Sequence, residues 1–148
     1  MPAEPVFLDP GGGTALALGD SDLWFKAEGD STAGALSVME FTLAPGFPGP
    51  VPHTHREMTD IFYVLEGTVT FLVGEEQKVG AAGTFVLVPP GNVHTFSNPS
   101  DQPARLLNLQ TPAGLEQYLK EVAALTSNGQ PDPAEMARLA SQYDFMPS

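Results

Sequence analysis

Glycine and proline divide this chain into short segments, and this division constrains its fold more than any other feature. The 148 residues include 15 glycines and 15 prolines, spread between brief runs of β-branched, leucine and aromatic residues. Such spacing is typical of an all-β chain of short strands and tight turns. Because no long helical pattern separates the runs, a closed barrel or jelly roll is favoured over a parallel sheet.

Ten strands and two turns are expected in the first three quarters of the chain. The strands lie at 14–18, 22–27, 35–43, 52–56, 60–65, 68–73, 78–80, 84–88, 93–97 and 104–110. Glu66 and Gly67 separate two of them and predict a two-residue hairpin loop, because glycine accepts a positive φ. Pro90 followed by Gly91 predicts a type II turn.

The last third of the chain has helical periodicity instead. Thr111 is expected to cap a first helix with Pro112 in its first turn. The apolar stripe of this helix comprises Leu115, Tyr118, Leu119 and Val122. Asp132, Pro133 and Glu135 predict the start of a second helix. Its stripe comprises Met136, Leu139, Ala140 and Tyr143. Because helices of about ten residues are too short to be stable alone, we expect both to lie against the barrel or a partner subunit.

The overall composition argues against several classes of partner. A chain of this length typically forms one domain. The net charge of -12 repels nucleic acid and anionic membranes, and no helix-turn-helix pattern is present. The first residues lack the features of a secretory signal, and no apolar run approaches a membrane span, so we expect a soluble cytoplasmic protein. Because cysteine is absent, any metal must be held by imidazole and oxygen.

The three histidines, His53, His55 and His94, are candidate metal ligands. Residues two apart on a strand point to the same face, so His53 and His55 can converge on one ion. If the next strand begins at Asp60, it brings a carboxylate to the same end, and a neighbouring strand can add His94. An isolated histidine is more often structural than a ligand, so this spacing alone leaves both interpretations open.

From Gly46 to Asn98 the sequence resembles the cupin superfamily in two consecutive motifs. The first motif contains a glycine, H-x-H, a glutamate and a further glycine. It corresponds here to Gly46 or Gly49, then His53, His55, Asp60 and Gly67. The second motif is met by Gly83, Pro89, Gly91, His94 and Asn98. Asp60 replaces the family's glutamate and is preferred to Glu57, whose offset from the glycine does not fit the motif.

This resemblance implies a fold, a cofactor and an assembly. It implies a double-stranded β-helix, a jelly-roll-like barrel, in a single cupin domain over residues 1–148. The barrel then occupies about 14–110 and the helical extension about 112–145. It further implies that the interior holds one divalent metal ion bound by His53, His55 and His94, for which we expect Asp60 as the fourth ligand, and that the assembly is a homodimer. Imidazole and carboxylate ligands suit Fe, Mn, Ni, Co, Cu and Zn, so the ligand set does not identify the metal.

Inward positions on the expected strands predict the wall of a substrate pocket. These positions are Met39, Phe41, Phe62, Val64 and Phe96. An apolar cavity suits a small aromatic or hydrophobic substrate. Each position taken singly is more typical of a barrel core than of a pocket wall.

Three functional hypotheses follow from the resemblance to small cupins related to quercetin dioxygenases. The leading one is a metal-dependent oxygenase of a small enolic or aromatic compound, with Asp60 as the catalytic base on a substrate hydroxyl. The second is a non-redox, metal-dependent polyketide cyclase or isomerase. The third is a non-enzymatic cupin that binds a small molecule or docks a partner, which requires an exposed apolar stripe between Leu115 and Val122.

Overall fold

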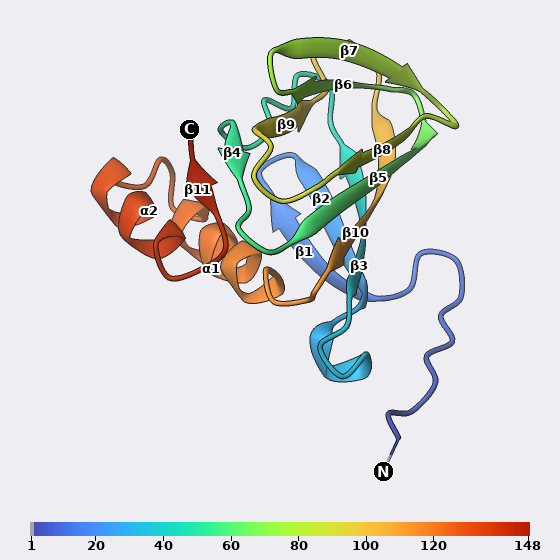
Figure 1. Cartoon of the computed structure of the whole chain (residues 1–148). Coiled ribbons are helices and arrows are strands. Elements are labelled where there is room, and N and C mark those ends of the chain that lie inside the picture. Colours follow the sequence, from blue (N-terminus) through green and yellow to red (C-terminus); the bar gives the residue numbers. More distant parts are fainter. Residues whose placement is uncertain (1) are drawn as a thin grey trace.

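Two antiparallel sheets form most of the computed structural model, which describes residues 2–148 (Figure 1). The strands of the larger sheet are, in spatial order, β1 (Thr14–Leu18), β2 (Ser21–Ala27), β3 (Ser37–Leu43), β10 (Ala104–Thr111), β5 (Thr59–Glu66) and β8 (Phe85–Val88). Those of the smaller sheet are β11 (Met146–Pro147), β4 (His53–Thr54), β9 (His94–Ser97), β6 (Thr68–Val73) and β7 (Glu76–Ala81). The predicted all-β, jelly-roll-like barrel with two C-terminal helices is confirmed.

The core of the barrel follows from the two-residue period of its strands. In β3 and β10 every second side chain is buried, because alternate residues point to opposite faces of a sheet. The buried apolar side chains are Leu23, Phe25, Met39, Phe41, Leu43, Phe62, Val64, Val69, Phe71, Val88, Phe96, Ala104 and Leu106. Full burial of a leucine or phenylalanine stabilises the fold by about 1.5–3 kcal/mol.

The turn at Glu66-Gly67 is not the hairpin that the sequence predicts. β5 pairs with β10 and β8, whereas β6 pairs with β7 and β9 in the other sheet. The two residues therefore form a corner at which the chain passes between sheets. Gly67 has φ 71°, and a Cβ there would lie 2.7 Å from the Pro103 carbonyl oxygen. A short glycine-containing loop fits a corner as well as a hairpin, so loop length could not distinguish them.

The first helix starts later than predicted, whereas the second starts where it was predicted. Thr111 is the last residue of β10 and does not cap a helix; α1 spans Glu116–Thr126. The prediction placed Pro112 in the first turn of the helix, but three residues, 113–115, separate this proline from α1. α2 spans Pro133–Ala140, and the Asp132 side chain accepts a hydrogen bond from the Ala134 N–H, as expected of an N-cap. A short 3-10 helix, η1, spans Gly29–Ser31.

The helices cover one end of the barrel, on the side opposite the N-terminal segment (Figure 1). Their apolar stripes and the residues that follow α2 form a second core, which contains Met58, Leu115, Tyr118, Leu139, Ala140 and Phe145. The chain then returns to the barrel, where β11 pairs with β4. The sequence did not predict this two-residue strand, and the strand expected at 52–56 is only His53–Thr54.

The outer face of the larger sheet is apolar near its β8 edge. Tyr63 and Phe85 are paired across β5 and β8 and are 42% and 59% exposed, and Leu87 on β8 is 47% exposed. Strands that are apolar on both faces are usually covered on both faces. Among residues 2–148, no helix is both long enough and apolar enough to cross a membrane.

Candidate metal centre

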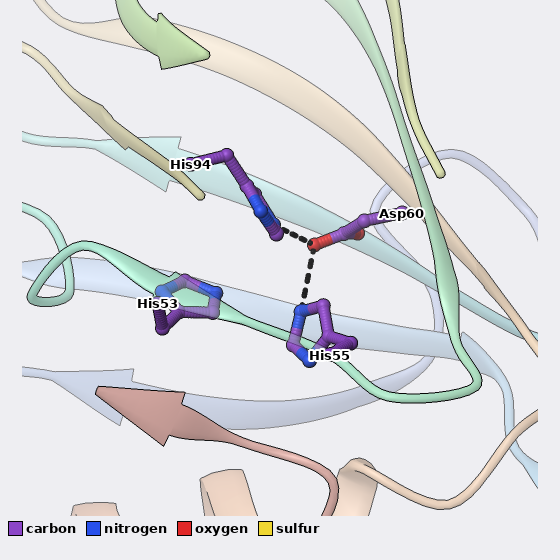
Figure 2. A group of neighbouring side chains, drawn as sticks. All are labelled: His53, His55, Asp60 and His94. Carbon is purple, nitrogen blue, oxygen red and sulfur yellow. Dashed lines mark hydrogen bonds and ion pairs between the residues drawn. The ribbon is translucent and has the colours of Figure 1, made fainter. Parts of the chain in front are cut away.

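The four predicted ligands come together at the helix-covered end of the barrel (Figure 2). His53 lies on β4 and pairs with His94 at the start of β9, and His55 follows the end of β4. Asp60 enters from β5 of the other sheet. All four side chains are buried, and one ligand atom from each lies within 4.8 Å of the others. The cluster therefore bridges the two sheets.

Each imidazole is oriented by a backbone carbonyl. The Nδ1 atoms of His53, His55 and His94 lie 2.7, 2.5 and 3.0 Å from the carbonyl oxygens of Val51, Asp144 and Asn92, respectively. A carbonyl can only accept, so each Nδ1 carries a hydrogen and each Nε2 is left for another partner. This arrangement of the second ring nitrogen is typical of histidines that bind metals.

One carboxylate oxygen of Asp60 faces the histidines, and the other accepts a hydrogen bond from a neighbouring side chain. Its Oδ2 lies 3.0 Å from His94 Nε2 and 3.4 Å from His55 Nε2, as the dashed lines of Figure 2 show. Its Oδ1 accepts a hydrogen bond of 2.6 Å from Asn108 Nδ2. Asn108 also donates to the Ile61 carbonyl oxygen at 2.9 Å and is buried on β10. The carboxylate is thereby held in one orientation.

The protonation of the cluster follows from burial and from these contacts. Burial outweighs the Val51 hydrogen bond and lowers the pKa of His53 to about 4, so this imidazole is neutral near pH 7. Burial also opposes ionisation of Asp60, but the ion-pair contact with His55 and the hydrogen bonds with His94 and Asn108 lower its pKa to about 2. For His55, the lowering effect of burial is outweighed by Asp60 and the Asp144 carbonyl, which raise its pKa. The carboxylate is therefore ionised, as a metal ligand must be.

The donor set fits a divalent metal ion. Within residues 2–148 the buried Nε2 atom of His55 makes no hydrogen bond, and its ion-pair contact with Asp60 Oδ2 is long, at 3.4 Å. A buried polar atom without a hydrogen bond costs about 1–3 kcal/mol. An ion held by three Nε2 atoms and one Asp60 oxygen would satisfy this atom and offset the negative charge. Imidazole and carboxylate suit several first-row metals and do not identify which one binds.

The predicted pocket residues pack in the barrel core. Phe96 lies 5.5 Å from Phe41 and 5.3 Å from Phe62 between ring centroids, and Phe62 lies 6.3 Å from the His94 ring. Met39 and Val64 are fully buried in the same core. All five side chains therefore belong to the barrel core, and Phe62 links this core to His94.

Three further residues of the site were not predicted from the sequence. Asn108 contacts Asp60, the Asp144 carbonyl contacts His55, and the Phe145 ring stacks on His53 with centroids 4.1 Å apart. A polar residue at an inward position of an otherwise apolar strand is a signal that could have indicated Asn108. No motif marks the C-terminal pair. Glu57, the other candidate for the acidic position, is exposed and lies outside the cluster.

Together, the fold and this site define a double-stranded β-helix barrel with an interior cluster of three histidines and one carboxylate. Residues 39–110 match the protein family described as "Cupin domain". This segment is therefore a cupin domain, as the two motifs predicted.

Similarity to individual proteins extends over part of the sequence and most of the fold. Germin-like protein 5-1 of Oryza sativa subsp. japonica is 34% identical over 88 residues, which are 56% of this chain and 39% of that protein. The chain thus spans less than half of the curated relatives that it matches. An RmlC-like cupin from Shewanella frigidimarina NCIMB 400 superposes with TM-score 0.66 at 23% identity, over 80% of this chain and 99% of the other. The polyketide cyclase RemF from Streptomyces resistomycificus superposes with TM-score 0.63 at 19% identity, over 73% of this chain and 80% of the other.

Proposed function

We propose that the chain is a metal-dependent oxygenase, similar to quercetin dioxygenases, that acts on a small enolic or aromatic compound. The observation that carries the proposal is that all three imidazoles are oriented so that they can bind one ion. Each Nδ1 is fixed by a backbone carbonyl, and the Nε2 of buried His55 makes no hydrogen bond to the described residues and faces Asp60 Oδ2 at 3.4 Å. Such a centre supplies a Lewis acid and, with a redox-active metal, a place for dioxygen chemistry.

The surroundings of the cluster support an apolar substrate. Phe62 lies below the histidines and Phe145 covers His53, so a polar sugar would find few partners there. Apolar walls also exclude water, which strengthens the attraction between the ionised Asp60 and any cation beside it. A flat ring or conjugated enol offers the kind of surface that aromatic walls contact well.

Asp60 is the residue to which we assign proton transfer. It is the single carboxylate of the cluster, and Asn108 holds one of its oxygens while the other faces the histidines. The histidines and Asn108 hold the pKa of Asp60 below its ordinary value, so the carboxylate is ionised and can accept a proton from an enol whose hydroxyl a bound metal ion would acidify.

Oxygen uptake tests the proposal. Apoprotein loaded separately with Fe, Mn, Ni, Co, Cu and Zn is offered a panel of small enols and phenols, and dioxygen and substrate are measured together. We expect equal consumption of dioxygen and substrate with a redox-active metal, and none in a variant that carries both His53→Ala and His94→Ala. Asp60→Asn should abolish turnover while most of the metal stays bound. Turnover without Asp60, or no consumption under any loading, would contradict the proposal.

A non-redox cyclase or isomerase is the second candidate. The polyketide cyclase RemF shares this fold, and an ion with one carboxylate meets the Lewis-acid and base needs of such chemistry. Substrate conversion in the absence of dioxygen, supported by the zinc form, would favour this function over the oxygenase.

The helices give less support to a role in docking a partner. Leu115 and Tyr118 are buried, and Leu119 and Val122 pack against the same second core. The apolar stripe that such docking requires therefore packs against other residues of the same chain.

A further inference from the structure

The C-terminal residues contact the metal centre although they lie far from its motifs in sequence. The Asp144 carbonyl oxygen accepts the hydrogen bond from His55 Nδ1 across 89 positions of the chain. Phe145 stacks on His53 with an angle of 21° between the rings. Met146 and Pro147 then pair with β4, the strand that carries His53. This segment therefore lies against two of the three histidines.

The Asp144 carboxylate binds the loop that joins two of the ligands. Its Oδ1 accepts a hydrogen bond from the Arg56 N–H, and its Oδ2 accepts bonds of 3.0 Å from the N–H groups of Glu57 and Met58. Three successive N–H groups around one anion form a concave anion site. Residues 56–58 are the connection between His55 and Asp60, so one side chain holds the whole turn between an imidazole and a carboxylate.

We propose that Asp144 is a positioning residue of the metal centre. Its carboxylate sets the separation of His55 and Asp60, and its carbonyl holds His55 in the form that leaves Nε2 for the ion. The inference rests on the metal binding proposed above but not on the oxygenase chemistry.

This role differs from general anchoring of the C-terminal segment. The segment has separate anchors, because the Tyr143 hydroxyl donates to Glu121 Oε2 at 2.6 Å and the Ser148 N–H donates to the Pro52 carbonyl at 2.8 Å. Neither of these two hydrogen bonds involves a metal ligand or the loop 56–58. Removing the Tyr143 hydroxyl therefore weakens the attachment of the segment and leaves the three N–H groups paired with Asp144.

The test compares Asp144→Asn and Asp144→Ala with Tyr143→Phe as the matched control. Co²⁺ affinity is measured by competition with a chelator, together with the rate of Co²⁺ release and the electronic spectrum of the bound ion. Loss of groups that orient metal ligands typically weakens metal binding about 10–100-fold, and we expect this for Asp144→Ala with faster release and an altered spectrum. Asp144→Asn retains one acceptor oxygen and should lie between it and the wild type. Tyr143→Phe should match the wild type.

A second measurement needs no metal. Long-range ¹H–¹⁵N spectra of the apoprotein at alkaline pH report which nitrogen of His55 carries the hydrogen. We expect Nδ1 in the wild type and Tyr143→Phe, and a mixture of both forms in Asp144→Ala.

Each outcome of these measurements decides the inference. Co²⁺ affinity and release within about twofold of wild type in both Asp144 variants would overturn it, as would an equal loss in Tyr143→Phe. If Asp144→Ala does not fold, Asp144→Asn is judged by the same criterion. A wild type that binds no metal would refute the proposed centre as well, whereas a metal-binding wild type with unaffected Asp144 variants would refute only the positioning role.

Discussion

Replacing Gly49 with alanine should destabilise the barrel far more than the same change at Gly46. Both glycines have φ 77°, so both variants carry the penalty of about 1–2 kcal/mol for a left-handed alanine. A Cβ on Gly46 would meet no atom within 4 Å, whereas one on Gly49 would collide with the Phe96 carbonyl oxygen. Relieving that collision requires movement of backbone, and overpacking of this kind costs about 1–3 kcal/mol or more.

Urea denaturation of the metal-free variants measures this difference. We expect Gly49→Ala to lose about 2 kcal/mol more unfolding free energy than Gly46→Ala, with unchanged m-values. Equal losses, within about 0.5 kcal/mol, would refute the steric argument. Because Phe96 lies two residues after His94 on β9, a shift there also moves His94 relative to His53. Gly49→Ala should therefore weaken Co²⁺ binding as well, which would identify Gly49 as the glycine that the first motif requires.

Three further predictions concern the acidic ligand, the pH dependence and the assembly. Asn108→Leu removes the hydrogen bond to Asp60 Oδ1 and should weaken Co²⁺ binding about 10-fold in a chelator competition. Burial lowers the pKa of His53 from 6.5 to about 4, so the unfolded chain binds more protons between these values. The apoprotein should therefore lose up to about 3 kcal/mol of unfolding free energy as the pH falls from 6.5 to 4, and a His53→Gln variant should lose much less. We propose that two copies associate through the apolar outer face of β5 and β8. A two-fold axis would place this face of one copy against the same face of the other. In sedimentation, Leu87→Glu should then be monomeric while Val79→Glu, on the exposed face of β7, stays dimeric; a monomeric wild type would contradict this.

The sequence predicted those features that depend on local period and local turn chemistry. The alternation of inward residues on β3 and β5, the N-cap at Asp132 and the positive φ of Gly91 are all properties of a few neighbouring residues. The sheet to which a strand belongs depends instead on contacts with residues that are distant in the sequence. β5 and β6 are adjacent in sequence but lie in opposite sheets, because Gly67 permits close approach to the distant Pro103 carbonyl.

The residues of the site also divide into those that the sequence predicted and those that it did not. His53, His55 and His94 were found because motif spacing and strand period place them together. Asp144 was not, because its partners are N–H groups of the backbone, which have no residue type to recognise in a sequence. A contact of this kind becomes visible only when the fold has brought the two segments together.

The contact between Asp60 and Asn108 gives a physical reason for the aspartate that replaces the family's glutamate. Asp60 Oδ1 lies 2.6 Å from Asn108 on the neighbouring strand, while Oδ2 lies 3.0 Å from His94 across the barrel. A side chain one methylene longer would carry both oxygens further from β5, and it could keep the His94 contact only by releasing Asn108. The shorter acid and the buried amide therefore form one unit, in which the amide fixes one oxygen and directs the other toward the histidines. The departure from the motif thus preserves the placement of one negative oxygen among three imidazoles, which is the feature that a metal ion requires.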